Sequence, residues 1–256
     1  MSGGGQASPA LLSPQDAALA EWRPRCCGLV NLGGSSFMNA TLQCLLHTTE
    51  LSNFFLRFLH MKDMNVDNAL GCKGKLAESF HLLLDQTHSH SASCADQREQ
   101  GKCANSSVSP HDIRRCISDF SSHCQDFFTK PDSHELIAFL LDGLHEDLNR
   151  VKRKPRTLNV LGDGSNDAND ARDAWDRYKM RNDSFIADTF HSQTRRQVRC
   201  SECNNMSVSF EPSAHMSLAF ERPGEDAAAP TRLESMLEAD VKPKRYDGQK
   251  PISCWR

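Results

Sequence analysis

The chain has 256 residues, of which 38% are hydrophobic and 25% are charged, and its formal net charge is -3. This length suffices for one large globular domain, while the slightly acidic balance and 7% aromatic content give no basis for nucleic-acid binding. No apolar run reaches the length of a membrane span. We therefore expect an intracellular protein, cytoplasmic or nuclear, whose eleven cysteines are reduced thiols.

The first 23 residues have the composition of a disordered leader. Residues 1–14 are rich in glycine, serine and proline and lack the basic and apolar regions of a signal peptide. We expect one domain over residues 24–256, with two surface insertions or linkers at 85–107 and 155–170, where polar and turn-forming residues interrupt the helical pattern.

A glycine-rich turn runs into an amphipathic helix between Gly28 and Gln43, with the sequence GLVNLGGSSFMNATLQ. Ser35 and Ser36 stand where an N-cap is expected. Apolar residues then recur near helical spacing, which predicts one buried helix face made of Phe37, Met38, Leu42, Leu45 and Leu46. The positive field of a helix N-terminus lowers the pKa of a thiol placed there, but this chain carries serine at position 36.

Further helices are predicted along the first two thirds of the chain. Apolar spacing indicates helices over 51–60 and 69–84, a helix that starts near Ser109 and Pro110, and a short helix over 171–180. Together they predict a helical lobe that extends to about Met180.

The segment 131–151 predicts a long helix with one apolar and one acidic side. Asp132 and Glu135 lie one turn apart at its start, where an aspartate caps the helix and negative charge favours its dipole.

Two half-buried strands are predicted between Gln193 and Phe220, with Cys200 and Cys203 in the turn that joins them. A redox CxxC pair would open a helix, so this CxxC favours a zinc knuckle. Zinc requires four ligands, and Cys254 is interpreted as the first half of a second pair. The expected cofactor is therefore structural zinc at an incomplete site.

The stretch from Gly28 to Gln43 resembles the cysteine box of the ubiquitin-specific proteases, G-L-x-N-L-G-N-T-C-[FY]-M-N-[SA]-x-L-Q. By this resemblance Ser36 stands at the position of the nucleophilic cysteine, and Asn31 matches the asparagine that helps to stabilise the oxyanion. Gly34 and Ser35 replace the usual Asn-Thr pair.

The helix at 131–151 resembles a second box of the same family, Q-Q-D-S-Q-E-[FL]-L-x-F-L-L-D-x-L-H-E-D-L-N. The resemblance implies that Asp132 and Glu135 contact the basic C-terminal tail of ubiquitin, which makes ubiquitin or ubiquitinated proteins the expected partners. Lys130, Pro131 and His134 replace glutamines of the box.

The matches run from about Arg25 to about Leu218. They imply an α+β, papain-like cysteine protease fold, with a helical thumb lobe followed by the start of an antiparallel β palm and fingers region that carries the zinc knuckle. The C-terminal part of that domain is expected to be missing.

The family's histidine box, G-H-Y-x-A-[YF], has no match in these residues, and His191 and His215 lack its flanking residues. A serine hydroxyl without a neighbouring base is a poor nucleophile. Three function classes stay open: a deubiquitinating cysteine protease whose sequence is incomplete, a catalytically dead ubiquitin-binding or scaffold protein, and a serine hydrolase. The sequence GGSSF lacks the nucleophile elbow of the third class. For these residues alone we favour the second class and predict no activity.

Overall fold

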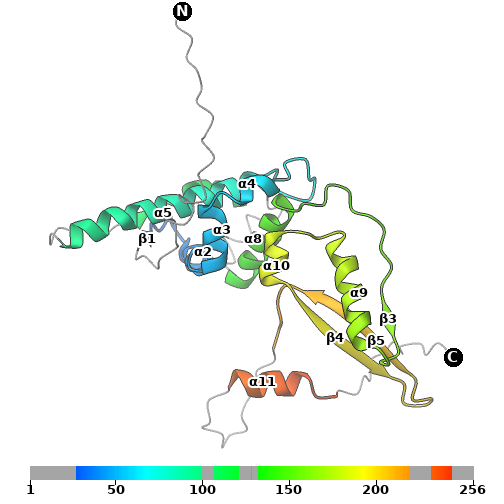
Figure 1. The fold of residues 1–256 in the computed structure, drawn as a ribbon. Helices are drawn as coiled ribbons and strands as arrows, with labels where there is room; N and C mark the ends of the chain where they lie inside the picture. Colours follow the sequence, from blue (N-terminus) through cyan, green and yellow to red (C-terminus); the bar gives the residue numbers. More distant parts are fainter. Residues whose placement is uncertain (1–26, 100–106, 121–127, 129–131, 219–231, 244–256) are drawn as a thin grey trace, which may run out of the picture. The chain divides into compact units, whose positions relative to one another are not determined.

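The computed structural model describes residues 27–99, 107–120, 128, 132–218 and 232–243, so the predicted leader and Cys254 lie outside the described residues (Figure 1). The chain divides into two compact units, residues 1–154 with 180–189 and residues 155–179 with 190–256. No helix within the described ranges is long and apolar enough to cross a membrane.

The first unit is helical, as the sequence predicts. A parallel pair of short strands, β1 (Gly28–Leu29) and β2 (Ser107–Val108), accompanies the helices. The helices α2, α3, α5 and α8 contact one another and bury an apolar core that includes Met38, Leu42, Phe55, Phe80, Leu136 and Leu140. The helices of the unit are α2 (Ser36–Leu46), α3 (Thr49–Leu56), α4 (His60–Asp63), α5 (Lys75–Glu99), α6 (His111–Phe120), α8 (Ser133–Asp147) and α10 (Phe185–Phe190).

Several helix boundaries differ from the prediction: α5 starts at Lys75 and not at residue 69, and the helix expected from residue 171 starts at Asp167. Helix α5 continues to Glu99, although a loop was expected from Asp85, because this polar stretch contains no glycine or proline to stop it. The helix expected over 51–60 is divided, since Phe58 adopts a positive φ of 55° between α3 and α4.

The carboxylate of Asp147, at the end of α8, is fully buried against the start of α5. It accepts hydrogen bonds from the backbone N–H groups of Cys72 at 2.6 Å, Leu76 at 3.1 Å and Ala77 at 3.2 Å. Burial raises the pKa of Asp147, and the backbone N–H groups oppose this rise by favouring the charged form. One side chain thus satisfies the unpaired donors at the start of α5 and holds α5 to α8.

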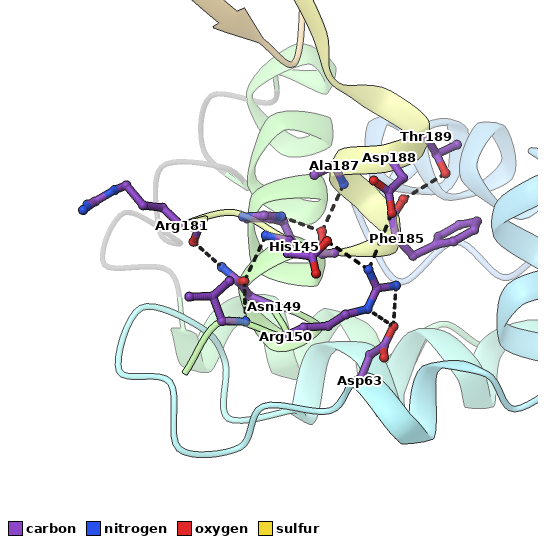
Figure 2. A network of polar contacts seen from close by, with 12 residues as sticks. Asp63, His145, Asn149, Arg150, Arg181, Phe185, Ala187, Asp188 and Thr189 are labelled. Atoms are coloured by element: carbon purple, nitrogen blue, oxygen red, sulfur yellow. Dashed lines mark hydrogen bonds and ion pairs between the residues drawn. The ribbon is translucent and has the colours of Figure 1, made fainter. Parts of the chain in front are cut away.

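The residues around the end of α8 also hold the segment that leads into α10 (Figure 2). His145 Nδ1 lies 2.7 Å from Ser184 Oγ, and this hydroxyl accepts a hydrogen bond from Ala187 N. Asn149 Nδ2 donates to the carbonyl of Arg181 at 3.1 Å. Burial lowers the pKa of His145, which favours a neutral imidazole in this network.

Arg150 contacts three carboxylates, of which those of Asp63 and Asp188 are labelled in Figure 2. Its guanidinium contacts Asp63 at 2.8 Å, Asp183 at 3.1 Å and Asp188 at 3.6 Å. Its backbone N–H also donates to the carbonyl of Asp183 at 2.8 Å. These contacts join the residue that follows α8 to α4, to the segment before α10 and to α10 itself.

The second unit contains a three-stranded antiparallel sheet with the order β3-β5-β4. The predicted pair of strands is confirmed as a hairpin, in register from Ser192 opposite Ser213 to Arg199 opposite Met206. Helix α9 contacts all three strands, so the helical lobe does not extend to Met180 as expected. The elements are β3 (Leu161–Gly162), α9 (Asp167–Lys179), β4 (Ser192–Arg199), β5 (Met206–Ser213) and α11 (Leu233–Asp240).

Two imidazoles lie within an aromatic cluster of the first unit. The ring of His60 is 4.7 Å from those of Phe55 and His81, and its Nδ1 is buried with no hydrogen-bond partner in the described structure. Burial, reinforced by the charge of His81, lowers the pKa of His60 to about 4. Burial also lowers the pKa of His81, against the opposing effect of Asp85 and Glu78.

We therefore expect the protein to lose stability as the pH falls through the window from about 6.5 to about 4, because the unfolded chain binds a proton at His60 that the folded chain resists. Between pH 7 and pH 5 the loss from this residue should be about 2 kcal/mol. Urea unfolding followed by circular dichroism measures it. His60→Phe should flatten the pH dependence, whereas substitution of the exposed His111 by alanine should leave it; an unchanged slope in His60→Phe would contradict the assignment.

Candidate functional site

The turn before α2 is organised around the side-chain oxygen of Asn31. This Oδ1 accepts hydrogen bonds from Gly33 N at 3.1 Å, Ser35 N at 3.3 Å and Ser35 Oγ at 3.1 Å. The turn needs Gly33 and Gly34, since their φ angles of +82° and +63° lie in the region that favours glycine. The geometry explains why an asparagine followed by glycines and a serine forms this turn.

Ser35 occupies the N-cap position of α2, as expected, but its side chain makes no capping hydrogen bond. Its hydroxyl is fully buried, accepts a hydrogen bond from Leu32 N at 2.8 Å and donates to Asn31. The serine side chain therefore holds the turn together and does not cap the first N–H groups of α2.

The arrangement of donors around Asn31 fixes the identity of its two amide atoms. Three donors converge on Oδ1, so the other position is the NH₂ group, a hydrogen-bond donor. Asn31 is exposed, and its amide nitrogen makes no hydrogen bond within the described residues. It is chemically suited to bind an oxygen atom that carries negative charge.

Ser36 is the first residue of α2 and is exposed to solvent. Its hydroxyl has no hydrogen-bond partner in the part of the chain that the structure describes. The position places a side chain in the positive field of the helix N-terminus, but this field does not by itself remove a proton from a serine hydroxyl.

Two polar side chains of α2 fasten the preceding strand to the helix. Asn39 Nδ2 donates to the carbonyls of Leu29 at 3.2 Å and Val30 at 3.1 Å, and Gln43 Nε2 donates to Cys27 O at 2.9 Å. Polar residues one and two turns after Ser36 therefore position the strand that leads to Asn31.

Helix α6 contributes contacts to the turn that the sequence analysis missed. Arg114 Nη1 donates to Leu32 O at 2.5 Å, and the Arg114 guanidinium lies 4.8 Å from the centre of the Phe128 ring. The one sequence signal for such a role is that Arg114 is three residues before the buried Ile117, at the border of the buried face of α6.

Asp132 is the N-cap of α8, as predicted. Its Oδ1 accepts hydrogen bonds from His134 N at 2.8 Å and Glu135 N at 3.2 Å. Both Asp132 and Glu135 are exposed, so their carboxylates form an accessible acidic group at the start of a helix that packs against α2.

The chain is similar to a known protein family and to curated relatives. The family model for ubiquitin carboxyl-terminal hydrolase matches residues 27–241. The chain belongs to the ubiquitin carboxyl-terminal hydrolase family. It is 39% identical over 218 residues to ubiquitin carboxyl-terminal hydrolase 4 of Bos taurus, covering 85% of this chain and 21% of that protein. It is 38% identical over 196 residues to ubiquitin carboxyl-terminal hydrolase 15 of Homo sapiens, covering 77% and 19%. The chain thus spans about a fifth of these relatives.

Solved structures confirm the fold. The SAGA DUB module with Ubp8, Sgf11, Sus1 and Sgf73 bound to monoubiquitin matches with a TM-score of 0.55 at 16% identity, covering 90% of this chain and 42% of that chain. The same module bound to ubiquitin aldehyde matches with a TM-score of 0.53 at 17% identity, covering 90% and 41%. The predicted α+β, papain-like architecture of the hydrolase family is therefore correct.

The remaining predicted site residues of this hydrolase-family chain belong to its second unit. Cys200 and Cys203 lie in the turn between β4 and β5, which is closed by a hydrogen bond from Cys200 N to Asn205 O at 2.9 Å. Among the described residues no group of three or more potential metal ligands comes together. The turn therefore supplies a pair of thiols, and its expected partner Cys254 lies outside the described residues.

The two histidines considered in the sequence are also in the second unit. His191 is half-buried, and its Nδ1 lies 2.6 Å from the hydroxyl of Tyr178 on α9. His215 is exposed just after β5. The bond to Tyr178 indicates a structural role for His191.

Proposed function

We propose that this chain binds ubiquitin and, as these 256 residues, does not hydrolyse it. The observation that carries the proposal is Ser36, which stands where the resemblance to ubiquitin-specific proteases requires a cysteine and whose hydroxyl has no hydrogen-bond partner within the described residues. Nucleophilic catalysis by serine depends on a neighbouring base. The Asn31 amide alone supplies part of the oxyanion stabilisation and no proton transfer.

We propose that the helical unit binds ubiquitin, because its site residues form an ordered, hydrogen-bonded arrangement. Asn31, Asn39 and Gln43 hold the turn and helix in a defined arrangement without any requirement for a thiol. The neighbours bound to monoubiquitin and to ubiquitin aldehyde support a ubiquitin-binding role for this fold.

We expect these 256 residues to show no multiple turnover of a ubiquitin C-terminal fluorogenic amide, because loss of a catalytic triad costs on the order of a millionfold in rate. Ser36→Cys should gain a single reaction with a ubiquitin carrying an electrophilic C-terminus, because the helix N-terminus favours the thiolate. Fluorophore release and the mass of the adduct are the measurements. Turnover by the unmodified chain that disappears in Ser36→Ala would support a serine hydrolase instead.

The exposed carboxylates of Asp132 and Glu135 are proposed to contact the basic tail of ubiquitin. Asp132 also caps α8 through its Oδ1, so replacement by alanine would disturb the helix as well as the charge. Asparagine is an equally good N-cap and carries no charge. The two roles are therefore separable by a single substitution.

We expect Asp132→Asn combined with Glu135→Gln to weaken ubiquitin binding by about tenfold at low salt, with a smaller difference at high salt, because exposed charges are screened. The control is Asp142→Asn, which removes an exposed carboxylate further along the same helix. Calorimetric titration with ubiquitin measures both. Equal affinities for the double variant and the control would restrict Asp132 to its capping role.

Structural zinc is proposed for the turn between β4 and β5. Two thiols in a hairpin turn fit half of a tetrahedral zinc site, and Cys254 is the proposed next ligand. Metal bound there would hold the turn and would take no part in chemistry at Ser36.

With an incomplete ligand set, zinc should bind weakly, at about one equivalent, and should be lost to a chelator. Elemental analysis before and after chelation and reloading checks this, with Cys200→Ala expected to abolish binding. Tight stoichiometric zinc that survives Cys254→Ala would show that other ligands complete the site.

A further inference from the structure

The turn that carries Asn31 has little packing on its outer side. A Cβ atom added at Gly33 or Gly34 would meet nothing within 4 Å, so open space surrounds both residues. Leu32 N donates to Ser35 Oγ, and Ser35 Oγ donates to Asn31 Oδ1. These bonds close the turn on itself, but they do not fix it to α6 or to the other helices of the unit. The position of the turn must therefore come from bonds at its edges.

Arg114 provides such a bond from helix α6. Its Nη1 donates to the carbonyl of Leu32 at 2.5 Å across 82 residues of sequence. Charge-assisted hydrogen bonds of this kind are short and about twice as strong as neutral ones. Since the N–H of Leu32 is bound by Ser35, Leu32 is held from inside the turn and from outside it.

The same guanidinium also reaches the residue that follows Ser36. It lies 4.8 Å from the centre of the Phe128 ring, and this ring meets the ring of Phe37 edge-on with centroids 5.8 Å apart. Cation–π and edge-to-face contacts are both orientation-dependent. Arg114 thus contacts the turn directly before Ser36 and, through Phe128, the side chain directly after it.

The neighbouring arginine shows that this arrangement is specific to one position. Arg115 is exposed, and its ion pair with Asp112 at 3.4 Å stays within its own helix. Arg114 is half-buried and directs its charge to the turn. Of these two consecutive arginines, Arg114 contacts the turn, whereas Arg115 pairs within its own helix.

We propose that Arg114 is a positioning residue that fixes the Asn31 amide relative to the side chain at position 36, so that an acyl carbonyl attacked at position 36 places its oxygen on Asn31. This proposal rests on the proposed function, because it takes ubiquitin as the partner whose C-terminus lies at position 36, where Ser36→Cys would react with it. Arg114 itself does not contact the reacting atoms.

The reaction that tests it is acyl transfer to Ser36→Cys from ubiquitin carrying a C-terminal alkyl thioester. The introduced thiolate forms a C–S bond to the carbonyl carbon, the electron pair moves to the carbonyl oxygen, and its return expels the alkyl thiolate. A thiolate leaving group needs no general acid, so the rate depends on the oxyanion donors and not on a histidine. Alkylation of the same thiol by iodoacetamide forms no oxyanion and reports thiolate reactivity alone.

In the Ser36→Cys background, Arg114→Ala should slow acylation by at least about tenfold, since small displacements of catalytic groups carry large rate penalties, while alkylation by iodoacetamide stays within about twofold. Arg114→Lys should recover part of the rate, because it keeps the charge but lacks the planar fork. Arg115→Ala should leave both reactions unchanged. Equal slowing of both reactions, or equal acylation rates in Arg114→Ala and Arg115→Ala, would overturn the proposal.

A second measurement uses the unaltered serine chain. Hydrogen exchange of the amides from Leu32 to Asn39 should be faster in Arg114→Ala than in the parent and unchanged in Arg115→Ala, and equal exchange in all three proteins would overturn the proposal without any chemistry at position 36. Absence of both ubiquitin binding and acylation in Ser36→Cys, together with faster exchange in Arg114→Ala, would contradict the proposed function while the turn-holding role of Arg114 stands.

Discussion

A buried carboxylate at the end of α8 is the constraint on which the helical unit depends. If Asp147 left its site, the backbone N–H groups of Cys72, Leu76 and Ala77 would lose their hydrogen-bond acceptor. These N–H groups lie just before and within the first turn of α5. A buried charge is costly unless it is fully hydrogen-bonded, and here the backbone supplies the bonds. The start of α5 is thereby tied to α8, whose opposite end carries Asp132.

In the candidate site, as at Asp147, a few side chains hold several backbone groups in place. Asn31 and Ser35 form a closed set of hydrogen bonds inside the turn, and Asn39 and Arg114 bind its edges from two different helices. The site is thus assembled from backbone carbonyls held by side-chain amides and a guanidinium. None of these hydrogen bonds involves the hydroxyl of Ser36, so the shape of the turn does not depend on which nucleophilic atom stands at position 36.

The sequence predicted those parts of the structure that depend on residues close together in the chain. The buried face of α2, the cap at Asp132 and the β4–β5 hairpin follow from spacing and capping preference, and the structure has them, except that Phe37 of the predicted face is half-buried. The extent of α5 was missed because the polar stretch after Asp85 carries no apolar stripe, although it contains nothing that breaks a helix. The inward role of Ser35 was missed because a serine before a helix is usually read as its cap, although its bonds to Leu32 and Asn31 are local. The contact of Arg114 with Leu32 spans 82 residues, and its place beside the buried face of α6 is too weak a signal to identify the partner.

The chain leaves the helical unit and later returns to it, and this path determines where insertions and deletions can be accommodated. Residues 155–179 leave the helical unit and residues 180–189 return to it, so the first of these segments is an excursion whose two ends are clamped by Arg150 and Asp183. Closing a loop costs little more when it is lengthened. Insertions in the connecting residues 155–160 and 163–166, which lie outside β3 and α9, can therefore be accommodated while Phe185 keeps its stacking partner Phe54 in the helical core. Length variation between relatives of this chain should concentrate there and spare the return segment.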